Sequence, residues 1–405
     1  MIDYLKEYFD FKAFFLCLAL VGMGLVSVYS ATYDAGAAAI FDRQLIWAGG
    51  GLVLLLVMAL FPIKTLQRLA FPTYILMLGL LVVVLLIGKT TSGSKSWFGI
   101  GGLGGQPSEF AKVATILALA AFLSKTTTSL SNVRHLVIAA GIVLVPIVLV
   151  LMQPDLGTSV VFFTMLLPIL YWGGASNFVL AAIFAPIIVA AGALFGTFAL
   201  LFTLALAGAM LYWTRENRFA AAVALGITLA VALSVQTVYD RMPAYQQKRI
   251  ATFLNSELDP RGAGYNVVQS KVAIGSGGVF GKGYLQGTQT QLNFIPEQWT
   301  DFIFCVPGEE FGFAGASLVL ICFTALLLHG VHVAGLSKNK FASAAAIGIV
   351  GVFATHMLIN IGMSMGILPV IGIPLPFLSY GGSALMANMA MVGLLMNFYS
   401  NRKER

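Results

Sequence analysis

Charged residues are scarce in this chain. Asp, Glu, Lys and Arg make up only 10% of its 405 residues, whereas soluble domains contain about one quarter. Hydrophobic residues account for 59%, and the mean hydropathy is +0.91. A water-soluble globule this apolar could not cover its surface with polar groups. The composition excludes a cytoplasmic enzyme, a disordered scaffold and a secreted disulfide-rich module, and it predicts a polytopic membrane protein.

Cysteine is also scarce, and positive charge is not clustered. Cys17, Cys305 and Cys322 lie in or beside apolar segments, at spacings that suit neither a zinc site nor a disulfide framework. The net charge is +7, but the basic residues stand singly or in pairs in short loops. That distribution is typical of a topology signal and argues against a nucleic-acid partner. The first apolar run, 11–31, is long enough to span a membrane, and no cleavable signal peptide is evident.

The apolar runs predict an all-α protein with about twelve transmembrane helices, since a span needs roughly 20 mainly apolar residues. The whole chain, 1–405, is expected to form one membrane domain. The predicted helices are 11–31, 45–61, 69–88, 107–124, 133–152, 157–172, 176–195, 197–213, 218–238, 303–329, 342–366 and 379–399. The break at Gly196 between the seventh and eighth of these is weak.

Lys and Arg in the loops predict the orientation. Over the short loops, thirteen lie on the N-terminal side of the membrane and four on the opposite side. Both termini are therefore expected in the cytoplasm. The long loop 239–302 and the shorter loop 89–106 then lie outside, and both are rich in glycine. A polar loop this long in a compact protein is usually functional, so the chemistry is expected in these loops and at the helix ends beneath them.

Charged residues beside the apolar segments are candidates for function, because such residues are expensive in a membrane. Glu109 and Lys112 share one face at the start of a predicted helix, three residues apart. The pair could serve function, or it could be a helix cap with a local ion pair, which when exposed is worth about 0.2–0.5 kcal/mol. Asp155 follows Pro154 in a strong turn signal, so a structural role is favoured there.

The densest cluster of polar residues ends the long loop. Asp301 lies where that loop enters the membrane, and we expect partial desolvation to raise its pKa toward the range useful to a general base. The alternative is that Asp301 caps the helix that follows. Glu309 and Glu310 lie about two turns deeper and are interpreted as structural residues or as supports for Asp301.

Two further patterns carry little weight. The glycines at 99–104 match G-x-G-x-x-G, but they follow a membrane helix and not a Rossmann strand. His329 and His332 are three residues apart at a cytoplasmic helix end, without a third metal ligand.

Four motifs together resemble the SEDS family, the RodA/FtsW group. They are Gln-Pro-Ser-Glu at 106–109, Gln-Pro-Asp-Leu-Gly-Thr at 153–158, Phe-Ile-Pro-Glu with Thr-Asp-Phe-Ile-Phe between 294 and 304, and Pro-Phe-Leu-Ser-Tyr-Gly-Gly-Ser at 376–383. Their order and spacing agree over nearly the whole chain. The segments 270–278 and 287–292 look closer to the elongation branch, RodA, than to the division branch.

The resemblance implies a peptidoglycan polymerase of the bacterial cytoplasmic membrane that acts in cell elongation and rod shape. Such proteins join lipid II units into glycan strands outside the membrane, with undecaprenyl diphosphate as leaving group. They work with a class B penicillin-binding protein and with other membrane proteins of the elongation complex. The family's essential aspartate maps to Asp301, and its Glu and Lys map to Glu109 and Lys112. The family usually has ten helices, so 197–238 is predicted to be an extra pair inserted before the long loop.

The implied reaction needs a base and a counter-charge for the diphosphate. Asp301 is the candidate base. The charge could be offset by Lys112, Arg43, Lys271 or Arg249, or by a divalent cation, Mg²⁺ or Mn²⁺, with unknown ligands. The other residues expected to contact substrate are Trp97, Ser108, Glu109, Asp155 and Glu297.

A lipid II flippase or another transporter is the main alternative. A transporter is expected to carry charges near the membrane midplane and to contain inverted repeats. Here the charges gather at the outer rim and no repeat is visible, which favours the polymerase. A scaffold for the penicillin-binding partner is a further alternative.

Overall fold

The computed structural model describes residues 9–91, 94–100, 103–242, 244–254, 263–292, 294–296 and 298–404. Within these residues, twelve long helices overlap the twelve predicted ranges. They are α2 (Phe11–Tyr33), α3 (Ala38–Leu60), α4 (Ile63–Ile87), α5 (Pro107–Leu123), α6 (Val133–Leu151), α7 (Leu156–Trp172), α8 (Asn177–Leu194), α9 (Thr197–Thr214), α10 (Arg218–Arg241), α15 (Gly312–Leu336), α16 (Lys340–Ser364) and α17 (Gly382–Ser400).

Polar side chains set where many of these helices begin. The side-chain oxygen of each such residue accepts a hydrogen bond from a backbone N–H of the first turn, which has no partner inside the helix. These capping residues are Asp10, Asn132, Asp155, Ser176, Asn217 and Asn339.

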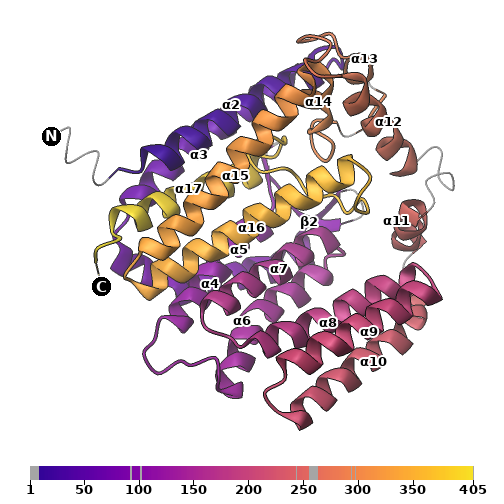
Figure 1. Ribbon diagram of the computed structural model, residues 1–405. Helices are drawn as coiled ribbons and strands as arrows, with labels where there is room; N and C mark the ends of the chain where they lie inside the picture. Colours follow the sequence, from indigo (N-terminus) through magenta and orange to yellow (C-terminus); the bar gives the residue numbers. More distant parts are fainter. Residues whose placement is uncertain are drawn as a thin grey trace.

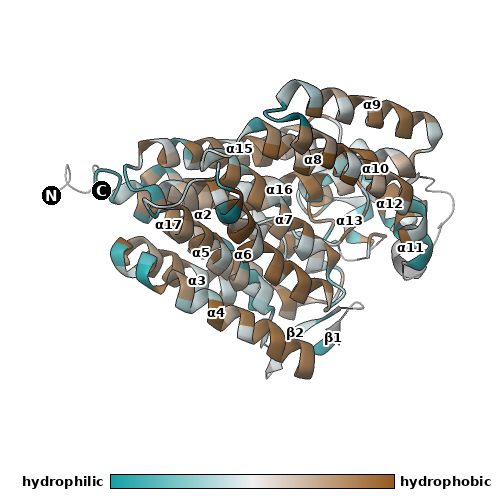
Figure 2. Cartoon of the chain, turned by 90° about the horizontal axis from the view of Figure 1, so that it is seen from below, coloured by the Kyte–Doolittle hydropathy of each residue, from teal (hydrophilic) through white to brown (hydrophobic). Residues whose placement is uncertain are grey.

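The chain is a multi-pass membrane protein. In the described part of the chain, nine helices are long and apolar enough to cross a membrane: α2, α3, α4, α6, α8, α9, α10, α15 and α16. Helices α5 and α7 have 17 residues each and, like α17, fall outside those limits. Hydrophobic residues cover most of the length of the helices, and hydrophilic residues gather at the loops and helix ends (Figure 2). That twelve helices span the membrane is still a prediction.

Helix α16 forms the centre of the main bundle. It packs against α5, α7, α15 and α17, and most of its side chains are buried. The N-terminus and the C-terminus lie at one end of the bundle, whereas α12–α14 lie at the other (Figure 1). This second end is called the distal end below.

Helices α8, α9 and α10 form a group of their own, beside α7 (Figure 1). A small apolar cluster, separate from the main core, joins them through Ala181, Ala185, Val189, Ala207, Leu211 and Ala224. Alanines let these helices approach closely, as is common in membrane helix packing. The pair α9–α10 therefore packs mainly on α8, and the main apolar core of the described residues contains no side chain of α9 or α10. That the pair α9–α10 is an addition to a ten-helix family core is still a prediction.

The all-α expectation holds for the membrane-embedded part, but the distal segments contain more structure than predicted. The predicted loop 89–106 forms a small antiparallel sheet of β1 (Lys89–Thr91), β2 (Ser94–Ile100) and β3 (Leu103–Gly105), in that order. The predicted loop 239–302 contains three helices, α11 (Ala244–Leu254), α12 (Ala263–Ser276) and α13 (Thr288–Gln291).

The prediction of one continuous helix over 303–329 is wrong. A short helix, α14 (Cys305–Glu310), is separated from α15 at Gly312. Gly312 has φ +63°, in the left-handed region that favours glycine. A side chain there would also collide with the backbone at Gly281, so glycine lets the segment 277–281 lie against this break.

Candidate active site at the distal end

Asp301 lies at the distal end, in a series of turns that precedes α14, and its side chain is half-buried. The amide of Asn360 on α16 donates to the backbone carbonyl of Asp301 at 2.9 Å and to that of Ile373 at 2.8 Å. A carboxylate oxygen of Asp301 faces Gly372, 3.4 Å from where a Cβ atom would lie. The N-cap position of α14 is Phe304, three residues after Asp301, and a capping role for Asp301 is still a prediction.

The connection between α16 and α17, residues 365–381, wraps around this aspartate. The hydroxyl of Ser379 donates to the Thr300 carbonyl at 2.6 Å, and the N–H of Tyr380 donates to the Trp299 carbonyl at 2.7 Å. On the other side, Gln44 of α3 donates to the Ser379 carbonyl at 3.2 Å. The backbone around Asp301 is therefore fixed by a segment that lies about 80 residues further along the chain.

Glu109 and Lys112 form a buried network with His356. Lys112 has no exposed surface, and its Nζ atom lies 3.0 Å and 2.9 Å from the two Glu109 carboxylate oxygens and 3.1 Å from Nε2 of His356. Because an ammonium group can only donate, Nε2 accepts. The other ring nitrogen, Nδ1, then carries the proton and donates to the Pro374 carbonyl at 2.9 Å. Lys112 is therefore fully buried and hydrogen-bonded to both Glu109 and His356, which differs from the exposed pair considered for this spacing.

Two residues of α16 connect this network to Asp301. His356 and Asn360 are four residues apart, so they lie on one face of the helix with Cβ atoms about 5–6 Å apart. His356 holds the carbonyl of Pro374, and Asn360 holds those of Ile373 and Asp301. The Lys112 network and the Asp301 backbone therefore fix adjacent residues of the same connection.

Asp155 has the structural role that its turn signal favoured, and a second contact as well. Its carboxylate accepts from the N–H and hydroxyl of Thr158, at 3.0 and 2.8 Å, and so caps α7. It also accepts from the Gln106 side chain at 2.8 Å. The N–H of Gln106 in turn donates to the hydroxyl of Ser383 at 3.1 Å. Ser108 is buried beside them at the start of α5.

Glu309 and Glu310 hold the distal segments together. Glu309 accepts from the side chain of Lys282 at 2.7 Å and from the N–H groups of Gln289 and Thr290 at 2.9 and 3.0 Å. Glu310 accepts from Ser30 of α2 and from Gln291. Their interpretation as structural residues fits these contacts.

The structure does not bring every predicted residue into this cluster. Arg43 is an exposed neighbour of Gln44 on α3. Trp97 lies in β2, over Gly104 of β3. Arg249 lies on α11, a helix that reaches α8 through a contact between Phe253 and Phe195.

Lys271, in contrast, lies close to the connection 365–381. It is exposed on α12, with its side chain against Gly366. The hydroxyl of Ser270, the residue before it, donates to the Ser364 carbonyl at the end of α16, at 2.9 Å. Glu297 lies outside the described residues.

The described residues contain no group of three or more His, Cys, Asp and Glu side chains that could hold a metal ion. The oxygens of Glu109 face the ammonium group of Lys112 at close range. Within the described residues, Glu109 and Lys112 therefore do not form a protein-built site for a divalent cation.

Comparison with known proteins identifies the family. The model of the FtsW/RodA/SpoVE family, described as a cell cycle protein, matches residues 11–199 and 178–404. The chain belongs to this family. Peptidoglycan glycosyltransferase RodA of Treponema pallidum is 35% identical, over 96% of this chain and 97% of the relative. Peptidoglycan glycosyltransferase MrdB of Escherichia coli K12 is also 35% identical, over 98% of this chain and 95% of the relative.

A solved structure supports the same membership in the FtsW/RodA/SpoVE family. This structure is described as "Structural coordination of polymerization and crosslinking by a peptidoglycan synthase complex". The matching chain has a TM-score of 0.75 and 28% identity, and the match covers 98% of this chain and 99% of the solved chain. The resemblance to the RodA branch is confirmed by the relative of that name.

Sequence patterns did not predict three residues of the site: His356, Asn360 and Gln44. Each lies in an apolar helix, and each bonds to the connection 365–381. The available signal was a polar side chain inside a predicted membrane helix, which is uncommon and usually has a partner.

Proposed function

We propose that this chain polymerises lipid II into glycan strands, with Asp301 as the general base. Its class, peptidoglycan glycosyltransferase, follows from the family and from relatives of that name at 35% identity over nearly their whole length. The observation that carries the proposal is the convergence of the motifs. Hydrogen bonds join the segments around Gln106, Asp155, Asp301 and Ser383 at one end of the bundle.

In the proposed reaction, a hydroxyl group of the acceptor sugar attacks C1 of the donor sugar. Asp301 accepts the hydroxyl proton while the new O–C1 bond forms and the bond from C1 to the lipid diphosphate breaks. Undecaprenyl diphosphate leaves with the electron pair, and a direct displacement inverts the anomeric carbon. The fixed backbone of Asp301 supports this role, since a base must be held within hydrogen-bond reach of the proton that it takes.

The cations have different roles in this proposal. Lys112 is fully buried and bonded to Glu109 and His356, and the Glu109–Lys112 pair carries no net charge, so we assign it the role of holding His356 and the connection 365–381. Lys271 is exposed beside that connection, and it is the better candidate for contact with the diphosphate. Arg43 and Arg249 are weaker candidates, and a divalent cation bound by the diphosphate itself is a further part of the proposal.

We place the protein in the bacterial cytoplasmic membrane, with both termini in the cytoplasm and the distal end outside. There it would act with a class B penicillin-binding protein and other elongation-complex proteins. The solved relative is part of a complex described by polymerisation and crosslinking, which supports a crosslinking partner.

The direct test is incubation of the purified full chain with its penicillin-binding partner on lipid II, followed by separation of the glycans by length. Long strands that a muramidase degrades are expected. If lipid II stays unpolymerised but crosses liposome membranes in the presence of the chain, the flippase alternative is right and the polymerase proposal is wrong.

The orientation predicts which positions an impermeant thiol reagent reaches on intact cells. The test uses Asn217→Cys and Gln286→Cys, each in a chain whose three native cysteines have been replaced; both positions are exposed. We expect labelling at Gln286 and protection at Asn217, because Arg215 and Arg218 flank the latter and favour the cytoplasm. Labelling at both would discard α9 and α10 as spanning helices. Protection at Gln286 would contradict an external active site.

A further inference from the structure

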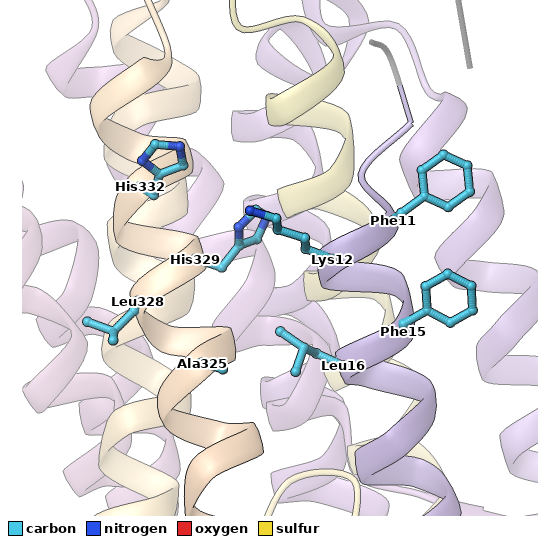
Figure 3. Close-up of a pocket in the computed structure, with 8 residues that line it drawn as sticks. All are labelled: Phe11, Lys12, Phe15, Leu16, Ala325, Leu328, His329 and His332. Carbon is cyan, nitrogen blue, oxygen red and sulfur yellow. The ribbon is translucent and has the colours of Figure 1, made fainter. Parts of the chain in front are cut away.

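A groove lies between α2 and α15 at the end of the bundle where the termini lie, far along both helices from the Asp301 site (Figures 1 and 3). It has a volume of about 770 Å³, within the range of small-ligand sites. Two helical turns of α2 and two of α15 line it, through Phe11, Lys12, Phe15, Leu16, Ala325, Leu328, His329 and His332.

The polar side chains of the lining form a rim toward the helix ends, where Phe11 also lies, and apolar side chains form the rest. Lys12, His329 and His332 lie toward the helix ends, whereas Leu16 and Leu328 lie nearer the middle of the bundle (Figure 3). A molecule with a charged head and hydrocarbon chains fits this order. Lys12 and His332 are exposed, so both can contact a head group at the membrane surface.

A hydrogen bond between His329 and Asp10 fixes the rim. Nε2 of His329 lies 2.6 Å from Oδ2 of Asp10, and Oδ1 of Asp10 accepts from the N–H of Ala13 at 3.1 Å. Asp10 is only 2% exposed. Asp10 is therefore buried with both carboxylate oxygens hydrogen-bonded, whereas Lys12 is an exposed cationic side chain of the rim.

We propose that this groove binds one anionic phospholipid of the membrane leaflet on the side of the termini. Basic pockets between membrane helices on the cytoplasmic side are suited to anionic head groups, and lysine can bury its stem while its ammonium group reaches the surface. The groove is too short for a partner's spanning helix, since two turns cover only about 11 Å of the roughly 30 Å core.

The test is native mass spectrometry of the purified full chain with phosphatidylglycerol or with phosphatidylcholine of the same acyl chains. We expect the wild type to retain one phosphatidylglycerol, with a preference of roughly fivefold or more. The double variant Lys12→Ala/His332→Ala should lose that preference. Lys340→Ala is the matched control, because Lys340 lies at the same end but outside the groove, and it should keep the preference. His329 is left unchanged because it is bound to Asp10.

Filling the groove tests its apolar part. Leu328→Trp should remove the retained lipid without changing the preference for head groups at other sites. Equal retention of both lipids by the wild type, or an unchanged preference in the double variant, would overturn the proposal. A dimer mass that Leu328→Trp abolishes, with lipid retention unaffected, would make this face an interface between copies and would overturn it as well.

Discussion

Asp301→Asn is expected to abolish glycan polymerisation while the protein stays folded in the membrane. The amide keeps the size of the side chain, and the bond from Asn360 goes to the backbone carbonyl, which the substitution leaves in place. The amide cannot accept the proton of the attacking hydroxyl. Since a positioned base contributes about 10²–10⁴-fold, the rate should fall by roughly a thousandfold or more on lipid II.

The matched control is Asp42→Asn, which neutralises an exposed carboxylate on α3. It should polymerise at nearly the wild-type rate. Near-normal strands from Asp301→Asn would remove Asp301 as the base, and equal losses in both variants would show only a general effect of charge.

The helices of this protein could be predicted from sequence because the bilayer demands long apolar runs. The twelve long helices of the described residues overlap the twelve predicted ranges. What local patterns could not predict was structure that depends on distant segments. The break at Gly312 is an example: one glycine in an apolar run gives no sign that the segment 277–281 will lie against it. The small sheet of β1, β2 and β3 was not predicted either, because its glycine-rich sequence indicated a loop.

In the candidate site, too, local features could be predicted from the sequence, and features that depend on distant segments could not. Asp301 and Asp155 could be found from sequence, since a carboxylate beside an apolar segment and a Pro-Asp turn are local features. The burial of Lys112 could not, because it depends on α16, which packs against α5. His356 lies 244 residues from Lys112 in the chain, and only the fold brings the two together.

This burial sets the design of the second large-effect experiment. Lys112→Met alone would leave the Glu109 carboxylate buried without its partner, which costs about 3–5 kcal/mol, so a loss of activity would have no clear cause. Replacing both charges avoids this problem, because a buried pair exchanged for uncharged side chains of similar volume is often neutral in stability. The informative variant is therefore Glu109→Gln/Lys112→Met.

We expect this double variant to stay folded, with a melting temperature close to that of the wild type, and to lose roughly a hundredfold in polymerisation. The reason is positional: without the Lys112 ammonium, Nε2 of His356 loses its donor, and the connection that His356 holds at Pro374 loosens beside Asp301. A displacement of about 1 Å near the reacting groups can cost 10²-fold. Wild-type activity in the folded double variant would reduce the Glu109–Lys112 pair to a structural feature of α5.

Two variants of His356 distinguish this positional mechanism from a general loss of packing. His356→Gln offers an oxygen acceptor to Lys112 and should keep activity within a few-fold, whereas His356→Leu should lose most of it at similar stability. Adding His356→Leu to Glu109→Gln/Lys112→Met should lower the rate no further, because residues that act through one contact are not additive. If the losses multiply instead, His356 acts independently of Lys112, and the connection around Asp301 is held in some other way than through this network.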